Sequence, residues 1–73
     1  MNIFPSQIEV EFLRNTYPAG TRVRLVFMND ARAVDPGTEG TVQHVDDAGT
    51  IHVNWDNGRG LGLIPGEDSW EII

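Results

Sequence analysis

"TIHVNWDNGRGLGL", residues 50–63, holds the pattern that decides the fold. Apolar and polar side chains alternate from Ile51 to Trp55, as they do in a β-strand with one buried face. A polar turn containing Asn-Gly follows, and Leu61 and Leu63 then alternate with glycines. The stretch therefore predicts a β-hairpin whose second strand is unusually bare.

The length of the turn decides which side chains share a face of this hairpin. A two-residue turn places both leucines on the polar face. A three-residue turn, with Gly58 in the left-handed conformation, places Leu61 opposite Val53, because a slip of one residue turns every side chain over. We predict the three-residue turn, which sets Arg59 across from Trp55.

The same register predicts a polar surface floored by glycine main chain, which we call the outer strip. It consists of His52, Asn54, Gly60 and Gly62. Glycine in a strand lets another backbone or a flat ligand approach closely, so the outer strip is a candidate binding site. In the alternative interpretation the N-terminal helix covers the glycines, and they serve packing.

Three further residues are candidate binding residues beside the outer strip. Asp56 and Arg59 flank it, and Trp55 with Arg59 could stack on a nucleic-acid base. The alternative is a cation–π contact between Trp55 and Arg59 across the hairpin.

A helix is predicted over residues 7–16. Ser6 and Glu9 have the spacing of a capping box, in which the serine hydroxyl accepts from the main-chain N–H three residues on. Pro18 ends the helix, because proline has no N–H and disfavours helix in the residue before it.

The predicted helix has two apolar faces. The face that packs on the body carries Val10, Leu13 and Tyr17. Ile8 and Phe12 fall on nearly the opposite side. Phe4 joins them if the helix starts early. This face either folds under the N-terminal residues or forms a self-association surface between copies.

Strands are also predicted on both sides of the hairpin. "TRVRLVFM" alternates from residue 21, and a short last strand covers Trp70–Ile73. In "TVQHV" the apolar positions Val42 and Val45 are three apart, so a β-bulge near Gln43–His44 is needed to turn both inward.

Five short strands with tight turns predict a mainly β fold. We expect a small five-stranded SH3-like antiparallel barrel over residues 21–73, preceded by one short N-terminal α-helix, with a first long loop at 29–37. The 73 residues form a single domain, 1–73.

The composition of the chain limits the classes of partner and site that it can be expected to have. Eleven acidic residues face five arginines and no lysine, a net charge of −6, whereas proteins that hold a phosphate backbone usually carry a basic stripe. Nucleic acid is therefore not an expected partner.

No cysteine is present, and no arrangement of residues indicates a catalytic site or a cofactor. His44 and His52 lie on neighbouring strands near Asp46, but nothing aims the two rings at one metal ion.

No apolar stretch approaches the roughly 20 residues that span a membrane, and the N-terminus lacks the pattern of a signal peptide. We expect a cytoplasmic protein with no membrane contact.

Two stretches, "YPAGTRVRLVFMND" and "PGTEGTVQHVDDAGTIHVNWDNG", together with "LIPGEDSWEII", carry a resemblance. The chain resembles an uncharacterised family, a domain of unknown function found in small bacterial and phage or mobile-element proteins. The resemblance implies a small barrel and a mobile-element setting, and it implies no catalytic residue. Two departures from the family's pattern are visible: His44 stands where a small residue is expected, and Ile8 and Phe12 replace polar residues on the helix. The second departure supports a contact particular to this chain at that helix face.

The sequence thus predicts a non-catalytic binding or assembly module that acts on a protein partner, such as a host factor, and that forms a homo-oligomer through Ile8 and Phe12. The alternative is a module that binds a nucleotide or short nucleic acid, for example a phage protein that sequesters a nucleotide signal of host defence.

Overall fold

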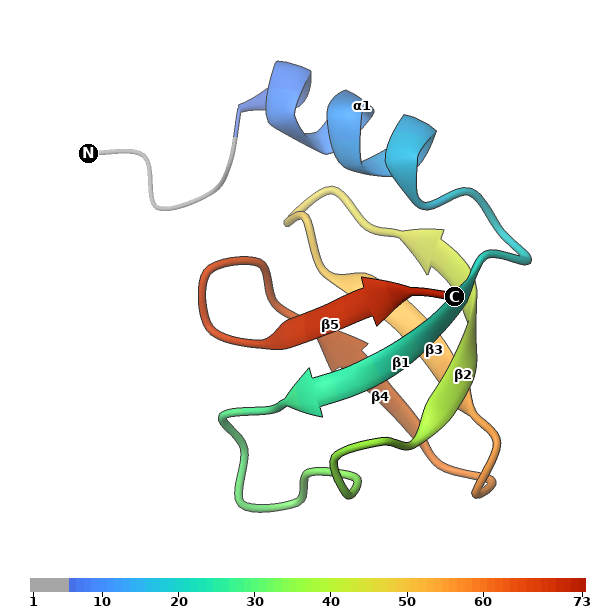
Figure 1. Ribbon diagram of the computed structural model, residues 1–73. Coiled ribbons are helices and arrows are strands. Elements are labelled where there is room, and N and C mark those ends of the chain that lie inside the picture. Colours follow the sequence, from blue (N-terminus) through green and yellow to red (C-terminus); the bar gives the residue numbers. More distant parts are fainter. Residues whose placement is uncertain (1–5) are drawn as a thin grey trace.

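The computed structural model describes residues 6–73, in which one helix precedes five strands (Figure 1). The elements are α1 (Gln7–Thr16), β1 (Arg22–Phe27), β2 (Glu39–Val45), β3 (Ile51–Trp55), β4 (Gly60–Leu63) and β5 (Ser69–Ile72). The predicted mainly β fold with one short N-terminal helix is confirmed, and α1 has the predicted bounds.

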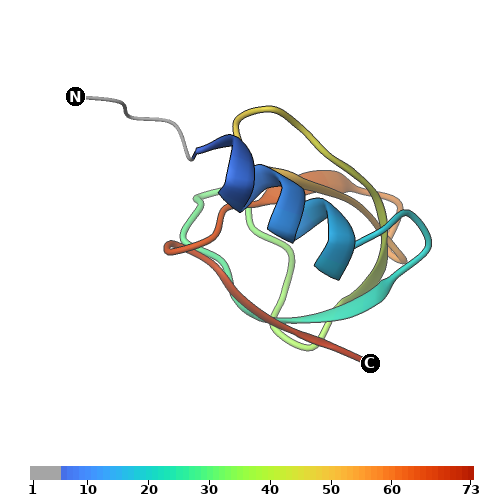
Figure 2. The same ribbon diagram turned by 90° about the horizontal axis from the view of Figure 1, so that it is seen from above.

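The strands form one antiparallel sheet in the order β4-β3-β2-β1-β5. The sheet curls around a common interior beneath α1 (Figure 2), and β4 and β5 are its two edges. An isolated bridge between Pro65 and Asp68 lies in the turn between these edges. The expected barrel is therefore a strongly bent sheet that stays open between β4 and β5.

The hairpin of β3 and β4 has the predicted register. Leu61 pairs with Val53, and the main-chain N–H of Trp55 donates to the carbonyl of Arg59 at 2.8 Å. Gly58 has a φ of 90°, in the left-handed region that favours glycine, and its N–H donates to the carbonyl of Trp55 at 2.9 Å. The three-residue turn is confirmed.

The predicted bulge in β2 is also present. The register between β2 and β3 shifts between Val42 and His44, and Val45 then pairs with Ile51. Both valines are buried, with exposed fractions of 1% and 5%. The extra residue thus lets two apolar positions with a spacing of three reach the same core.

The core lies inside the bend of the sheet. Its buried side chains come from four strands and the first loop: Val23, Leu25, Met28, Val34, Val42, Val45, Ile51, Val53, Trp55 and Leu63. Gly40 lies beneath this cluster, where a Cβ would stand 2.9 Å from the carbonyl oxygen of Asn54 and 2.9 Å from the Trp55 ring. Only glycine fits at this position without a shift of the core.

The helix closes one end of the bent sheet. Ser6 caps it by accepting from the main-chain N–H of Glu9 at 3.2 Å, as predicted. Val10 is 4% exposed, and Leu13 and Tyr17 pack against the core cluster. The predicted inward face of α1 is therefore confirmed, and the helix is anchored by apolar packing.

Candidate binding site

The outer strip lies at the surface of β3 and β4, where it lines a hollow of about 300 Å³. The residues around this hollow come from β2, β3 and β4: Gln43, His44, His52, Val53, Asn54, Gly60, Leu61 and Gly62. None of them belongs to α1, which packs against β2 instead. The alternative in which the helix covers the glycines is wrong, because the inward face of α1 lies on the end of the core.

The two glycines of the outer strip have different surroundings. A Cβ on Gly62 would stand 2.5 Å from the Cγ2 methyl of Thr50, so the threonine side chain already occupies that space. A Cβ on Gly60 would meet only the Oδ1 of Asn54, at 3.9 Å. Gly62 is thus explained by packing within the chain. Gly60 has no such explanation, because its surroundings have room for a side chain.

The main chain of β4 faces an open edge of the sheet. In an antiparallel pair, residues alternate between those that exchange main-chain hydrogen bonds and those that do not. Because Trp55 bonds to Arg59, the next bonded pair is Val53 with Leu61. The N–H and C=O groups of Gly60 and Gly62 therefore point away from β3. Across residues 6–73 neither glycine has a hydrogen-bond partner on that open side.

Two stacked histidines form the far wall of the hollow. The ring centroids of His44 and His52 are 4.4 Å apart and the rings are nearly parallel, at 11°. Nε2 of His52 lies 2.8 Å from Oδ2 of Asp46. Rings that stack face to face do not aim their nitrogens at a common point, and the described part of the chain holds no cluster of three metal-ligating side chains.

Asp46 holds this wall in place through the turn between β2 and β3. Its Oδ1 accepts from the main-chain N–H groups of Ala48 at 3.0 Å and Thr50 at 2.9 Å. The hydrogen bond with His52 is the largest cause that lowers the pKa of Asp46 from its usual value, and the two main-chain donors lower it further. The carboxylate is thus a fixed part of the strand connection.

Trp55 does not line the binding surface. Its side chain is 2% exposed, and its indole Nε1 donates to the carbonyl of Leu61 at 3.1 Å. Its place on the strand explains this position, because Trp55 continues the inward alternation of Ile51 and Val53. The predicted stacking of Trp55 on a base is therefore wrong for this structure.

Arg59 points away from the outer strip as well. Its guanidinium donates to the main-chain carbonyl of Ala33 at 3.3 Å and to that of Arg32. It therefore ties the β3–β4 turn to the first long loop. Because the guanidinium makes these two hydrogen bonds, the alternative of a cation–π contact between Arg59 and Trp55 is wrong.

Asp56 belongs to a ladder of ion pairs across the outer face of the sheet. Its two carboxylate oxygens accept from Arg22 at 2.8 and 2.7 Å, and this hydrogen bonding holds the pKa of Asp56 below its usual value. Arg24 pairs with Glu71 at 2.8 Å, and both arginines reach Glu39 at 3.4 Å. The two most central arginines are therefore already neutralised within the chain.

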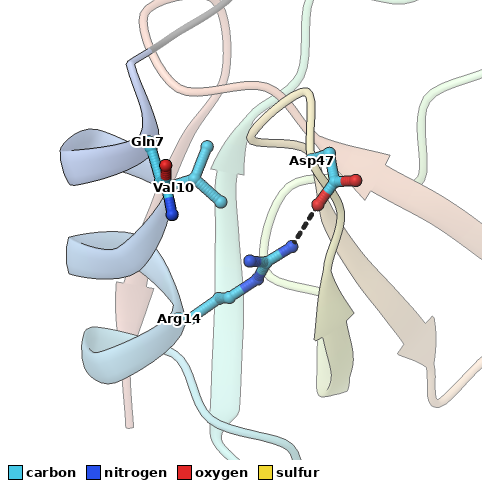
Figure 3. A pocket seen from close by; sticks show the side chains of 4 residues that line it. All are labelled: Gln7, Val10, Arg14 and Asp47. Atoms are coloured by element: carbon cyan, nitrogen blue, oxygen red, sulfur yellow. Dashed lines mark hydrogen bonds and ion pairs between the residues drawn. The ribbon is translucent and has the colours of Figure 1, made fainter.

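A further ion pair joins α1 to the β2–β3 turn (Figure 3). Nη2 of Arg14 lies 2.7 Å from Oδ1 of Asp47, and its Nε donates to the carbonyl of Val45 at 3.1 Å. Together with Gln7 and Val10 these side chains line a second hollow, of about 280 Å³. The sequence pattern did not predict this contact, because its partners are 33 residues apart.

Ile8 and Phe12 are exposed on the outer side of α1, with exposed fractions of 80% and 66%. They border a hollow of about 440 Å³ whose other lining residues are Glu9, Leu13 and Pro65. The alternative in which the N-terminal residues cover this face concerns residues 1–5, which lie outside the described residues. Within residues 6–73 nothing covers the pair.

Fold and surface together define a small, bent antiparallel β domain with a capping helix and a polar hollow at one sheet edge. A family model described as a domain of unknown function (DUF4314) matches residues 6–73. The chain belongs to this family, as its resemblance predicted. No curated protein matches the chain. Among the described residues no helix is long and apolar enough to cross a membrane.

Proposed function

We propose that this protein is a non-catalytic binding module that contacts a protein partner through the outer strip. The observation that carries the proposal is the hollow of about 300 Å³ on β2, β3 and β4, which α1 leaves uncovered and which adjoins a sheet edge that no strand within residues 6–73 pairs with. Its volume lies at the lower end of the range for small-ligand pockets, about 300–1,000 Å³. It therefore suits one or two side chains of a partner.

The contacts of the arginines and of Trp55 count against the nucleotide or nucleic-acid alternative. Binding to single strands combines exposed aromatic rings with a positively charged groove. Here Trp55 is buried, and Arg14, Arg22 and Arg24 are each paired with a carboxylate. A polypeptide needs neither feature, because it can be held by main-chain groups and by shape.

The resemblance to small phage and mobile-element proteins supports a proposal about where this protein occurs. We propose a cytoplasmic protein carried by a phage or mobile element, with a host factor as its partner. The genes that flank the coding sequence test the setting, and neighbours without any phage or transfer function count against it.

The assembly part of the proposal concerns Ile8 and Phe12. Two large apolar side chains exposed by 80% and 66% on one helix face favour contact with a second copy. This homo-oligomer is independent of the outer strip, because the two surfaces lie on α1 and on β3–β4.

Selection from a library of random twelve-residue peptides tests the binding proposal. Enriched peptides are expected to shift the amide resonances of His52 and Asn54, and to lose binding to Asn54→Tyr, which fills the hollow. The matched control Asn29→Tyr makes the same change at an exposed position after β1 and is expected to bind normally. Peptides that bind both variants equally, or that shift other residues only, overturn the proposal.

A further inference from the structure

The open edge of β4 offers main-chain donors and acceptors next to the hollow. Gly60 and Gly62 direct their N–H and C=O groups away from β3, and the described chain supplies no partner for them. Edge strands of this kind pair readily with another extended chain. Natural proteins often protect such edges with charged side chains or proline, but β4 carries only glycine and leucine.

At Gly60 no side chain of the described residues would keep a partner at a distance from the outer face of β4, whereas the Thr50 methyl lies over Gly62. Among residues 6–73 the atom nearest to the space above Gly60 is the Oδ1 of Asn54, which lies 3.9 Å from the point that a Cβ would occupy. A large flat side chain on an added strand can lie across a bare glycine in this way, as aromatic residues do beside edge glycines in sheets. The stacked rings of His44 and His52 provide a flat wall for it.

Charge decides which chain fits this edge. The protein carries a net charge of −6, and three of its five arginines are already paired with carboxylates. A second copy added along β4 brings a further −6 to a polar contact, without the apolar burial that offsets this repulsion where copies meet through Ile8 and Phe12. A segment with lysine or arginine is attracted instead, and the attraction is weakened by salt.

We infer that the outer strip takes an extended basic segment of the partner, added to β4 as a sixth strand, with one large flat side chain lying over Gly60. This inference rests on the proposed function and adds the conformation and chemistry of the partner. Main-chain hydrogen bonds to the two glycines hold the segment, and the hollow selects the side chain.

Amide hydrogen exchange of the protein, measured in complex with the peptides that the wild-type protein enriches, tests the mode of binding. The amides of Gly60 and Gly62 are expected to gain at least tenfold protection in the complex. The enriched peptides are expected to be basic, to carry an aromatic residue, and to bind at least several-fold more weakly in 0.5 M than in 0.05 M salt.

Two matched substitutions complete the test. Gly60→Val fills the space over the strand and is expected to weaken peptide binding at least tenfold, while the empty surroundings let it fold normally. Ser69→Val places the same side chain on the opposite edge strand, β5, and is expected to bind as the wild type does. A circular dichroism spectrum and melting curve for each variant confirm that it is folded.

The outcomes separate the two proposals. Peptides that depend on Asn54 but leave both glycine amides unprotected, or that bind Gly60→Val equally well, overturn strand addition and leave the binding proposal standing. Sedimentation that shows a dimer lost in Gly60→Val identifies the occupant as a second copy and also overturns the inference. Peptides that bind away from the outer strip overturn both.

Discussion

Gly40 and Gly60 both lie in strands, yet substitution by alanine is expected to act in opposite directions. At Gly60 a Cβ meets nothing closer than 3.9 Å, so Gly60→Ala is expected to stabilise the protein by about 0.5–1 kcal/mol, since alanine loses less backbone entropy on folding. At Gly40 the same entropic gain is opposed by contacts of 2.7 Å to Val53 Cγ1 and 2.9 Å to the Asn54 carbonyl.

The two variants share the contribution of backbone entropy. The difference between their free energies of unfolding therefore isolates the steric contribution. Insertion of a methyl group into a packed core typically costs about 1–3 kcal/mol. The atoms around Gly40 include main chain and the Trp55 ring, which cannot turn aside as a flexible side chain can. Gly40→Ala is therefore expected to be about 1–3 kcal/mol less stable than Gly60→Ala.

Thermal unfolding measured by circular dichroism checks this difference. For a domain of this size 1 kcal/mol corresponds to a shift in Tm of about 4–8 °C. Urea titration gives the free energy of unfolding independently, and an unchanged slope confirms that both variants unfold in the same way. If Gly40→Ala is as stable as Gly60→Ala, the close packing of β2 beneath Trp55 is refuted.

Three other predictions concern charge, assembly and ligand class. The folded pKa of Asp46 and of Asp56 is lowered, so their contribution is complete above the unfolded value near 3.9 and is lost as the pH falls through the folded pKa. Urea titrations below about pH 5 should show a free energy of unfolding that falls as the pH falls, and the fall should be less steep in Asp46→Asn than in the wild type. An equally steep fall in that variant contradicts the pairing of Asp46 with His52. Phe12→Ser is expected to abolish self-association in light scattering at high micromolar concentration and to leave the Tm of dilute, monomeric samples unchanged, because Phe12 is 66% exposed; a wild type that stays monomeric at high concentration refutes the oligomer. A single-stranded oligonucleotide at low salt is expected to leave the fluorescence of the two tryptophans, Trp55 and Trp70, unchanged, and a saturable change would restore the nucleic-acid alternative.

The elements and registers that follow from local pattern were predictable from the sequence. The three-residue turn was determined by the apolar spacing of Leu61 and Leu63, and the bulge in β2 by the spacing of Val42 and Val45. Ser6 marked the start of α1. Each of these features depends on residues close together in the chain, so the pattern alone was sufficient.

Side-chain partners across the sheet were not predictable in the same way. Arg59 reaches the carbonyl of Ala33, 26 residues away, and Asp56 reaches Arg22, 34 residues away. Trp55 was assigned to the binding surface although its own alternation placed it inward. The openness of the bent sheet also escaped prediction, because strand count and turn length do not determine whether the two edge strands meet.

The function proposed for the outer strip depends on β4 being an open edge, and amide hydrogen exchange in the free protein tests this most directly. The account predicts alternation along one strand, with slow exchange at Leu61 and Leu63, whose N–H groups face β3, and fast exchange at Gly60 and Gly62. Protection of all four amides to the same degree would contradict it, because the edge would then be covered in the free protein and closed to a partner.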